Sequence, residues 1–447
     1  MKKTIKTFST RAAMMLLAVM FTMNAQTAWA DASGSCGTNV TYSYVESTHT
    51  LTISGTGQMM YYGSALGSDS KYHSTAPWSG YDSEIETVVV EDGVTYIGSY
   101  AFAYCSALTS VSLPASVIAL GDYVCYSSSV THIDIPIATA AATLGKGGFD
   151  ATPNVLAIVV PANLMKTYKE ATNWSAYADQ FVGVLSESTG FDTNFAAGKY
   201  EYSRTFNCGV AATLCLPFDL RYTQILPYGK VYTFDGVDKT TNPKWTVVMR
   251  EDEPSNRVTG NLAANTPYLF LPYILDGKSQ GDAMPLIFTG EVTTAANAGY
   301  ASKAEGTDGA YWTFQGVYYN VAWNNGNANL GKVYGFAANS YNGGSYNVSP
   351  GDFVKAAAGA SIAPFRAFLQ FTPAGSSSRT RGADELPVTM SVRLISASGT
   401  PTAIGTLDTR TGEITFGDEW YSLDGRKLDG EPTKKGVYIY KGKKVIR

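Results

Sequence analysis

The residue types that most often carry out chemistry are sparse in this chain. Its 447 residues include five cysteines, at 36, 105, 125, 208 and 215, and three histidines, at 49, 73 and 132. Thiolates and imidazoles bind metals when they are closely grouped, but no C-x-x-C and no H-E-x-x-H occurs here. The cysteines are also too scattered for the disulfide framework of a small secreted domain. We therefore predict neither a metal site nor a cofactor.

One short motif matches a catalytic pattern in form. Residues 277–281 read GKSQG, the G-x-S-x-G pattern of a nucleophilic serine on a sharp strand-to-helix turn. That mechanism needs a histidine base later in the chain, and no histidine follows His132. No spacing pairs the two carboxylates of a glycosidase, and no phosphate-binding or dinucleotide-binding fingerprint is present. A glycine-rich loop explains the motif better, and we predict that the protein is not an enzyme.

The N-terminus has the three parts of a secretory signal peptide. Basic residues between Lys2 and Arg11 precede the short apolar run 12–23, and Ala28-Trp29-Ala30 supplies a small-x-small cleavage pattern. The run is too short to span a bilayer, and no later stretch approaches a spanning length. We expect a signal peptide over 1–30, an exported protein at the cell surface or outside the cell, and no transmembrane span.

The charge and composition narrow the range of partners. The signal segment holds four basic residues and no acidic ones, so its removal takes the formal charge from −4 to −8. An acidic chain disfavours nucleic acid as a partner. The 30 tyrosines and 44 glycines, with charged residues at 16%, are typical of an extracellular all-β protein.

The elements that must position any site emerge from an internal repeat. Four stretches share the pattern apolar-x-x-apolar-x-apolar, starting at Ile85, Leu108, Val130 and Val155, with separations of 23, 22 and 25 residues. An apolar residue followed by glycine recurs later in the first three units, as Ile-Gly at 97–98 and Leu-Gly at 120–121 and 144–145. This period predicts a leucine-rich-repeat solenoid, in which each coil is a strand and a turn-rich return that bury their apolar faces by stacking.

Alternation within the repeat strands defines a candidate binding face. It sends Val88 and Val90 inward and Thr87 and Val89 outward. Outward positions of successive coils form columns, and repeat proteins commonly bind partners there, although a plain solvated sheet face is the alternative. The predicted binding residues on this exposed strand face are Thr87, Val89, Ser110, Ser112, His132 and Asp134. The return-segment tyrosines 96, 100, 104, 123 and 126 offer further contact area, with some of them expected in the core.

The repeat also bears on two of the cysteines. Cys105 lies 20 residues after the first anchor of its unit, whereas Cys125 lies 17 residues after Leu108, in the slot that Phe102 fills in the first coil. A disulfide needs Cα atoms within about 7 Å, so two different slots predict that these cysteines are not bonded. We expect Cys105 to be a small buried hydrophobic residue.

The repeat region resembles a known family. The stretch VVVEDGVTYIGSYAFAYCSALTSVSLPASV is similar to the unit of BspA-type leucine-rich repeats of bacterial surface proteins, roughly I-P-x-S-V-x-x-I-G-x-x-A-F-x-x-C-x-x-L. HTLTISGTGQMMYY and APWSGYDSEIETVVV resemble the segment before those repeats, and VVPANLMKTYKEATNW resembles their final coil. The resemblance covers about residues 33–185, with an alanine-rich departure in the third unit. It implies a surface protein that binds host or bacterial proteins.

The two ends of the solenoid require capping structures that shield its core. The remainder of the chain is predicted to be β-structure. TYSYVESTHTLTIS predicts a hairpin, and 162–181 predicts a short capping helix. Strand-like runs between Gly, Asn, Pro and Asp clusters over 195–375 predict a β-sandwich-like domain. GSSSRTRGADE reads as a linker. Strands are predicted at 420–423, 437–440 and 444–446 of the tail.

The fold class is therefore mainly β, with six predicted segments. These are a signal peptide at 1–30, an N-terminal β cap at 31–84, repeats with a capping helix at 85–185, the sandwich-like domain at 195–375, a linker at 376–400 and a C-terminal β tail at 401–447. YSLDGRKL and GVYIYKGKKVIR in the tail resemble the C-terminal domains of exported Bacteroidales-type proteins and the sorting domain of type IX secretion cargo, with a shorter last hairpin.

Two functions of different class remain open, beside a purely structural role in the cell envelope. The first is adhesion-like binding of host or bacterial surface proteins by the repeats. The second is glycan binding by the 195–375 domain, for which exposed aromatic residues are required. The candidates for that second role are Trp245, Trp312, Trp323 and the nearby tyrosines, although core packing is the favoured fate of most of them.

Overall fold

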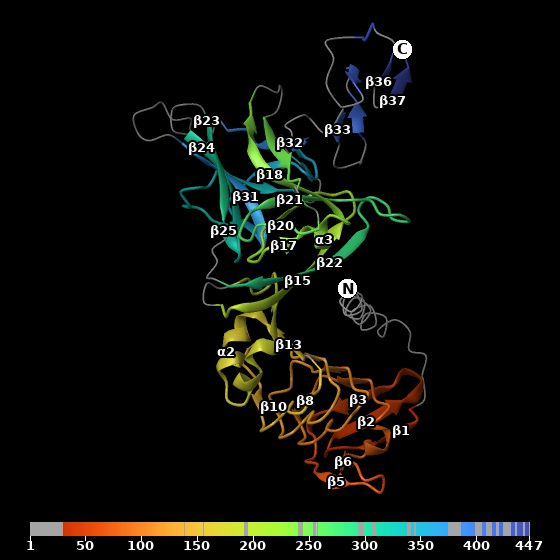
Figure 1. The fold of residues 1–447 in the computed structure, drawn as a ribbon. Helices are drawn as coiled ribbons and strands as arrows, with labels where there is room; N and C mark the ends of the chain where they lie inside the picture. Colours follow the sequence, from red (N-terminus) through yellow and green to blue (C-terminus); the bar gives the residue numbers. More distant parts are fainter. Residues whose placement is uncertain are drawn as a thin grey trace. The chain divides into compact units, whose positions relative to one another are not determined.

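The computed structural model describes residues 30–397, apart from 138, 155, 192–194, 240–244, 254–255, 257, 294–298, 306–309, 338–340, 344–345 and 374–385. In the tail it describes 405–407, 414–416, 420–422, 431–433, 436–440 and 443–446. The predicted signal peptide lies outside this part except for Ala30. The described residues form two compact units, shown in Figure 1: unit 1 falls within 1–158 and 171–180, and unit 2 within 159–170 and 181–447.

Unit 1 contains the strand ladder that the repeat predicts. An antiparallel hairpin opens it, with Tyr42 opposite Ile53 and Tyr44 opposite Leu51. The repeat strands then pair in parallel, each one coil further along. Every described anchor of the four repeats is at most 4% exposed, so the predicted apolar core is confirmed. The strands, in spatial order, are β1 (Ala32–Ser35), β2 (Val40–Val45), β3 (Thr50–Gly55), β7 (Thr87–Val90), β9 (Ser110–Ser112) and β11 (His132–Asp134).

A second parallel sheet, which the sequence pattern does not predict, closes each coil on another side. In this sheet Leu120 pairs with Ile97 on one side and with Leu144 on the other. These three are the apolar residues that precede the recurring glycines. The glycines that follow permit close stacking, because a Cβ on Gly121 would lie 2.5 Å from the backbone nitrogen of Ser99. The strands are β4 (Gly57–Gln58), β8 (Val94–Ile97), β10 (Ala119–Leu120) and β12 (Thr143–Leu144). A small hairpin, β5 (Ser64–Leu66) with β6 (Tyr72–Ser74), precedes the first repeat.

The return segments are joined by their own hydrogen-bond ladder. The amide of Phe102 donates to the carbonyl of Val124, and that of Cys125 donates to Gly148, so Phe102, Cys125 and Phe149 occupy one slot in successive coils. All five cysteines are buried and unbonded, which confirms the prediction for Cys105 and Cys125. Both thiols therefore act as small core residues.

Two tryptophans fix the ends of this stack. Trp78, just before the first repeat, donates its indole N–H to the Ala101 carbonyl at 2.9 Å. Trp174 donates to the Ala142 carbonyl at 2.7 Å and packs against Phe149. The predicted single capping helix over 162–181 is wrong, because the segment breaks into η3 (Ala162–Leu164), α2 (Met165–Glu170) and η4 (Trp174–Gln180). Of these, only η4 belongs to unit 1. The remaining short helices of unit 1 are η1 (Glu46–Thr48) and η2 (Ser79–Tyr81).

Unit 2 begins with a group of four strands that support its candidate pocket. β15 (Gly198–Asn207) pairs with β22 (Ala283–Val292) over its full length and is antiparallel to it. On its other edge, β15 pairs in parallel with β14 (Phe181–Leu185). The strand order is β13 (Ala157–Pro161), β14, β15 and β22.

The larger part of unit 2 is one strongly curled sheet. Its two halves face each other, since Phe234 and Phe314 approach within 6.1 Å of ring centroids and Trp245 and Trp312 within 6.3 Å. The expected sandwich-like packing around an aromatic core follows from this curling. The strand order is β16 (Ala212–Leu214), β21 (Tyr268–Pro272), β18 (Gly229–Asp238), β19 (Thr246–Glu251), β32 (Thr389–Ile395), β29 (Phe353–Lys355), β26 (Val333–Phe336), β31 (Arg366–Thr372), β24 (Ala310–Val317) and β23 (Tyr300–Glu305).

Strand β32 corrects the predicted linker. The linker over 376–400 is wrong at 389–395, because this stretch pairs in parallel with β19 and antiparallel with β29, and Met390 is fully buried. Its apolar residues fill the curled core, which a linker composition does not reveal. The GSSSRTRGADE stretch, residues 375–385, lies outside the described residues.

The smaller elements of unit 2 are short pairs and a helical turn. The strands predicted in the tail at 420–423, 437–440 and 444–446 are confirmed, because the structure has strands at Trp420–Ser422, Val437–Tyr440 and Lys443–Ile446. The short elements are β17 (Leu220–Arg221), α3 (Tyr222–Ile225), β20 (Asn261–Leu262), β25 (Val321–Trp323), β27 (Tyr341–Gly343), β28 (Tyr346–Val348), β30 (Ala360–Ile362), β33 (Gly405–Leu407), β34 (Ile414–Phe416), β35 (Trp420–Ser422), β36 (Val437–Tyr440) and β37 (Lys443–Ile446).

Candidate binding surfaces

The strand face of the repeats brings its predicted residues together. Thr87, Ser110 and His132 are in register across three adjacent strands. Val89, Ser112 and Asp134 form the second column. Five of the six side chains are half-buried, but Ser110 is only 3% exposed, so its predicted exposure is wrong. A serine flanked in register by two larger side chains has little surface of its own.

The two polar groups at the end of these columns engage each other. The Nε2 atom of His132 lies 2.9 Å from a carboxylate oxygen of Asp134. The face is therefore small, mildly polar and already partly satisfied internally, which weakens it as an anchor for a partner.

The return segments carry a larger aromatic surface. All five predicted tyrosines are half-buried and none is fully buried, so the expectation that some of them lie in the core is wrong. Two more tyrosines, missed in the sequence because they precede the first repeat, add to them: Tyr61 is 73% exposed and Tyr72 is 59% exposed. We name the set the tyrosine surface, and it consists of Tyr61, Tyr72, Tyr96, Tyr100, Tyr104, Tyr123 and Tyr126.

Ring contacts make most of the tyrosine surface continuous. Tyr104 stacks on Tyr72 at 6.4 Å between centroids and meets Tyr126 edge-on at 5.8 Å. Tyr126 in turn meets Tyr123 at 5.5 Å, and Tyr123 contacts Tyr100 at 5.0 Å. Tyr61 and Tyr96 form a separate pair at 5.4 Å. Such offset and edge-on pairs are favourable.

The backbone fixes these rings in place. Tyr100, Tyr104 and Tyr123 all have left-handed backbone conformations, with φ of 54°, 65° and 54°. That conformation is strained for a bulky residue and persists only where the surrounding structure enforces it. Here the return ladder enforces it, since the amides of Tyr100, Tyr104 and Tyr123 donate to carbonyls of the next coil. A surface held this rigidly loses little conformational entropy on binding.

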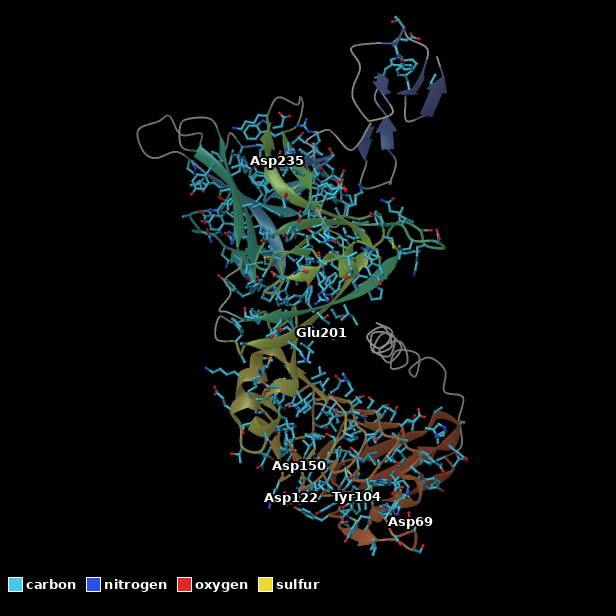
Figure 2. The ribbon with its side chains drawn as sticks, in the orientation of Figure 1. Asp69, Tyr104, Asp122, Asp150, Glu201 and Asp235 are labelled. Atoms are coloured by element: carbon cyan, nitrogen blue, oxygen red, sulfur yellow. The ribbon has the colours of Figure 1, made fainter. Side chains whose placement is uncertain are left out.

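Charged and polar groups border the tyrosine surface. Figure 2 labels Asp69, Asp122 and Asp150 along the same side of unit 1 as Tyr104, and all three are exposed. The hydroxyl of Tyr104 also contacts the Ser64 hydroxyl at 2.9 Å. Burial among its neighbours raises the pKa of Tyr100, so its hydroxyl is neutral at physiological pH. Rigid aromatic residues inside a polar rim are the anatomy of a protein-binding surface.

In unit 2 the aromatic residues divide between core and surface. Trp312 and Trp323 are 2% and 4% exposed, so core packing is confirmed for both, while Trp245 is half-buried under the Lys239 ammonium at 4.6 Å. On the outer side of β23, β24 and β31, a cavity of about 500 Å³ is lined by exposed Tyr300 and Tyr311. Its other lining residues are Ser302, Thr313, Gln315, Gln370 and Thr372.

Neither a metal-binding cluster nor a membrane-spanning helix is found among the described residues. In the part of the chain that the structure describes, no three His, Cys, Asp or Glu side chains are grouped so that they could hold a metal ion. Among these same residues, no helix is both long and apolar enough to cross a membrane.

Comparison with known proteins identifies the repeat class. Residues 80–175 match the BspA type leucine-rich repeat region in six copies. The chain therefore carries a BspA-type leucine-rich repeat region. Among solved structures, a leucine-rich repeat protein from Eubacterium ventriosum is similar at 21% identity, with a TM-score of 0.22, over 29% of this chain and 38% of that one. No curated protein matches the chain.

Proposed function

We propose that the protein is an exported surface protein that binds host or bacterial surface proteins through its repeat unit. The tyrosine surface is the observation that carries this proposal. Tyrosines are enriched in protein interfaces and at their energetic centres, because they supply a large rigid contact area with a polar tip. The strand face, at Thr87, Val89, Ser112, His132 and Asp134, is proposed as a secondary contact region.

Binding of the full-length protein to intact bacterial and host cells tests the proposal. Cells are assayed untreated, after surface proteolysis and after periodate oxidation of glycans. We expect proteolysis to remove binding and periodate to leave it. Replacing Tyr61 and Tyr72 by serine should weaken binding at least about tenfold, since interface hot spots contribute about 2 kcal/mol or more. These side chains are exposed, so the variant should keep its fold.

A matched variant separates the two faces of the repeat unit. Val89→Lys alters the strand face at a half-buried position without touching a tyrosine. If Val89→Lys abolishes binding and the tyrosine variant retains it, the strand face is the principal site. Full binding by both variants, or binding that resists proteolysis, would contradict the proposed function.

We propose glycan binding by unit 2 as the second candidate function. The supporting observation is the cavity of about 500 Å³ over β23, β24 and β31. Two exposed tyrosines among hydroxyl and amide side chains offer ring faces for a sugar and donors for its hydroxyls. A glycan array probed with the full-length protein and with Tyr300→Ala tests it. Signals that the variant loses support the proposal, and a flat array with the unaltered protein removes it.

A further inference from the structure

A pocket of about 610 Å³ lies in unit 2 where a strand edge is left unpaired. β15 has ten residues and pairs with β22 along all of them, but β14 covers the other edge only as far as Tyr202. Within the described residues, no strand pairs with that edge over 203–207. An unpaired edge presents alternating N–H and C=O groups that a further extended chain can bond.

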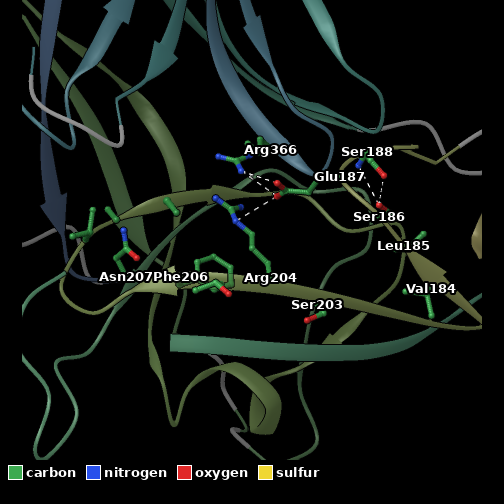
Figure 3. A pocket seen from close by; sticks show the side chains of 14 residues that line it. Val184, Leu185, Ser186, Glu187, Ser188, Ser203, Arg204, Phe206, Asn207 and Arg366 are labelled. Carbon is green, nitrogen blue, oxygen red and sulfur yellow. Dashed lines mark hydrogen bonds and ion pairs between the residues drawn. The ribbon is translucent and has the colours of Figure 1, made fainter. Parts of the chain in front are cut away.

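Two arginines and one glutamate line the pocket beside this edge, as Figure 3 shows. An Nη atom of Arg366, at the start of β31, donates to both carboxylate oxygens of Glu187, at 2.9 and 3.2 Å. The Nε atom of Arg204 lies 3.6 Å from the same carboxylate. Arg204 is held further by a bond from its Nη1 to the Thr213 carbonyl at 2.8 Å. These three are the only charged residues among the pocket's described lining.

The cluster has more positive than negative charge. Arg204 has a side chain only 9% exposed, and burial lowers its pKa. Burial alone would raise the pKa of Glu187, but hydrogen bonds from Arg366 and Tyr202 hold it below its ordinary value, so the carboxylate stays ionised. One carboxylate therefore faces two guanidinium groups. The Nε atom of Arg366 is also buried and has no hydrogen-bond partner among the described residues.

We propose that this pocket binds an extended peptide segment that carries a carboxylate. The peptide backbone would add to the free edge of β15 at 203–207, and its carboxylate would meet Arg366. The free edge is five residues long, which at about 3.3 Å per residue accommodates a strand of the same length. Addition of a strand supplies affinity through main-chain hydrogen bonds, and the guanidinium groups supply selectivity for the charge. Exposed Ser188 and Thr205 leave the rim polar.

Binding of immobilised random hexapeptides to the full-length protein tests the proposal. Each peptide is made twice, once ending in glutamate with a free carboxyl group and once as its glutamine-amide twin. We expect members of the acidic set to retain the protein at least about tenfold more strongly than their twins, the effect of about 1.4 kcal/mol from a charge-assisted bond. Hydrogen exchange should slow at amides of 203–207 when a retained peptide is bound.

Variants locate the site and guard against loss of the fold. Arg366→Gln should lose the preference for the acidic set, and Arg366→Lys should keep part of it. Ser188→Glu places a negative charge at the rim and should weaken binding at least about fivefold by repulsion. The matched control, Ser361→Glu, changes an exposed serine of β30 outside the pocket and should have no effect.

Three results of the peptide experiments would overturn the proposal. They are equal retention of acidic and amide twins, retention of no peptide at all, and binding without protection of 203–207. Galacturonate serves as a small-anion probe in the same assay. If it binds as tightly as the peptides and is lost in Arg366→Gln, the pocket is a site for an acidic sugar instead.

Discussion

Two buried tryptophans differ in one hydrogen bond, and that difference yields a sharp prediction. Trp78 is 1% exposed and donates its indole N–H to the Ala101 carbonyl. Trp312 is 2% exposed, and its indole nitrogen is buried with no hydrogen-bond partner among the described residues. Replacing either residue by phenylalanine removes the N–H and a similar part of the ring. The two variants therefore separate the hydrogen bond from the ring volume.

The expected magnitudes follow from these contacts. Leaving the buried Ala101 carbonyl without its donor costs about 1–3 kcal/mol, and the smaller ring costs about 1 kcal/mol. Trp78→Phe should therefore lower the free energy of unfolding of unit 1 by about 2–4 kcal/mol. Trp312→Phe should lower that of unit 2 by about 1 kcal/mol or less, because it also removes an unsatisfied donor.

Hydrogen exchange of the full-length protein, followed by mass spectrometry, measures both effects separately in each unit. In Trp78→Phe, the return-ladder amides of Phe102 and Tyr104 should exchange about 30 to 1000 times faster, since 1.4 kcal/mol corresponds to a factor of ten. Trp174→Phe, which removes the equivalent bond to Ala142, should behave in the same way. An equal or larger effect of Trp312→Phe would refute the reasoning, since ring volume would then outweigh the hydrogen bond.

Three further predictions concern unit 1. Gly121→Ala should lower its free energy of unfolding by about 2–4 kcal/mol, measured by the same exchange experiment, because the new Cβ meets backbone 2.5 Å away. Burial raises the pKa of Cys105 and Cys125, so an aromatic disulfide reagent at pH 8 should label neither thiol until denaturant is added; rapid native labelling would contradict their burial. Hydrogen bonds to Asp82 and Asp69 raise the pKa of His73. The β5–β6 hairpin should therefore be most stable below about pH 6.5 and lose this contribution as pH rises through the raised pKa, as followed by nuclear magnetic resonance; an unchanged pH profile in His73→Gln would exclude His73 as the cause.

The repeat region was the most predictable part of the molecule. Its period places an apolar residue at the same point of each coil, and a stack of coils has only one way to bury all of these residues. The positions of the strand anchors, the shared slot of Phe102 and Cys125, and the separate cysteines all followed from counting residues. The second ladder at Leu120 was not predicted, because two-residue strands carry no alternation that a pattern could reveal.

Which residues are exposed on the binding surfaces could not be predicted from local sequence patterns. The repeat predicted columns of outward residues, but the burial of Ser110 depends on the size of its neighbours across strands. Tyr61 lies before the first repeat, so no period assigns it to the tyrosine surface. Likewise, the composition of 376–400 indicated a linker, whereas the curled sheet of unit 2 takes up part of it to complete a core.

The sequence by itself determined the solenoid, its period and the mainly β character of the rest, because these depend on patterns within about 25 residues. Only the tertiary structure brought Arg366 to Glu187 and Arg204, since Arg366 lies 179 residues from Glu187 in the chain. Among the described residues, it likewise left the second edge of β15 without a paired strand over 203–207. Charge convergence and free strand edges arise from long-range pairing, and that pairing is selected by the packing of the whole unit rather than by any local pattern.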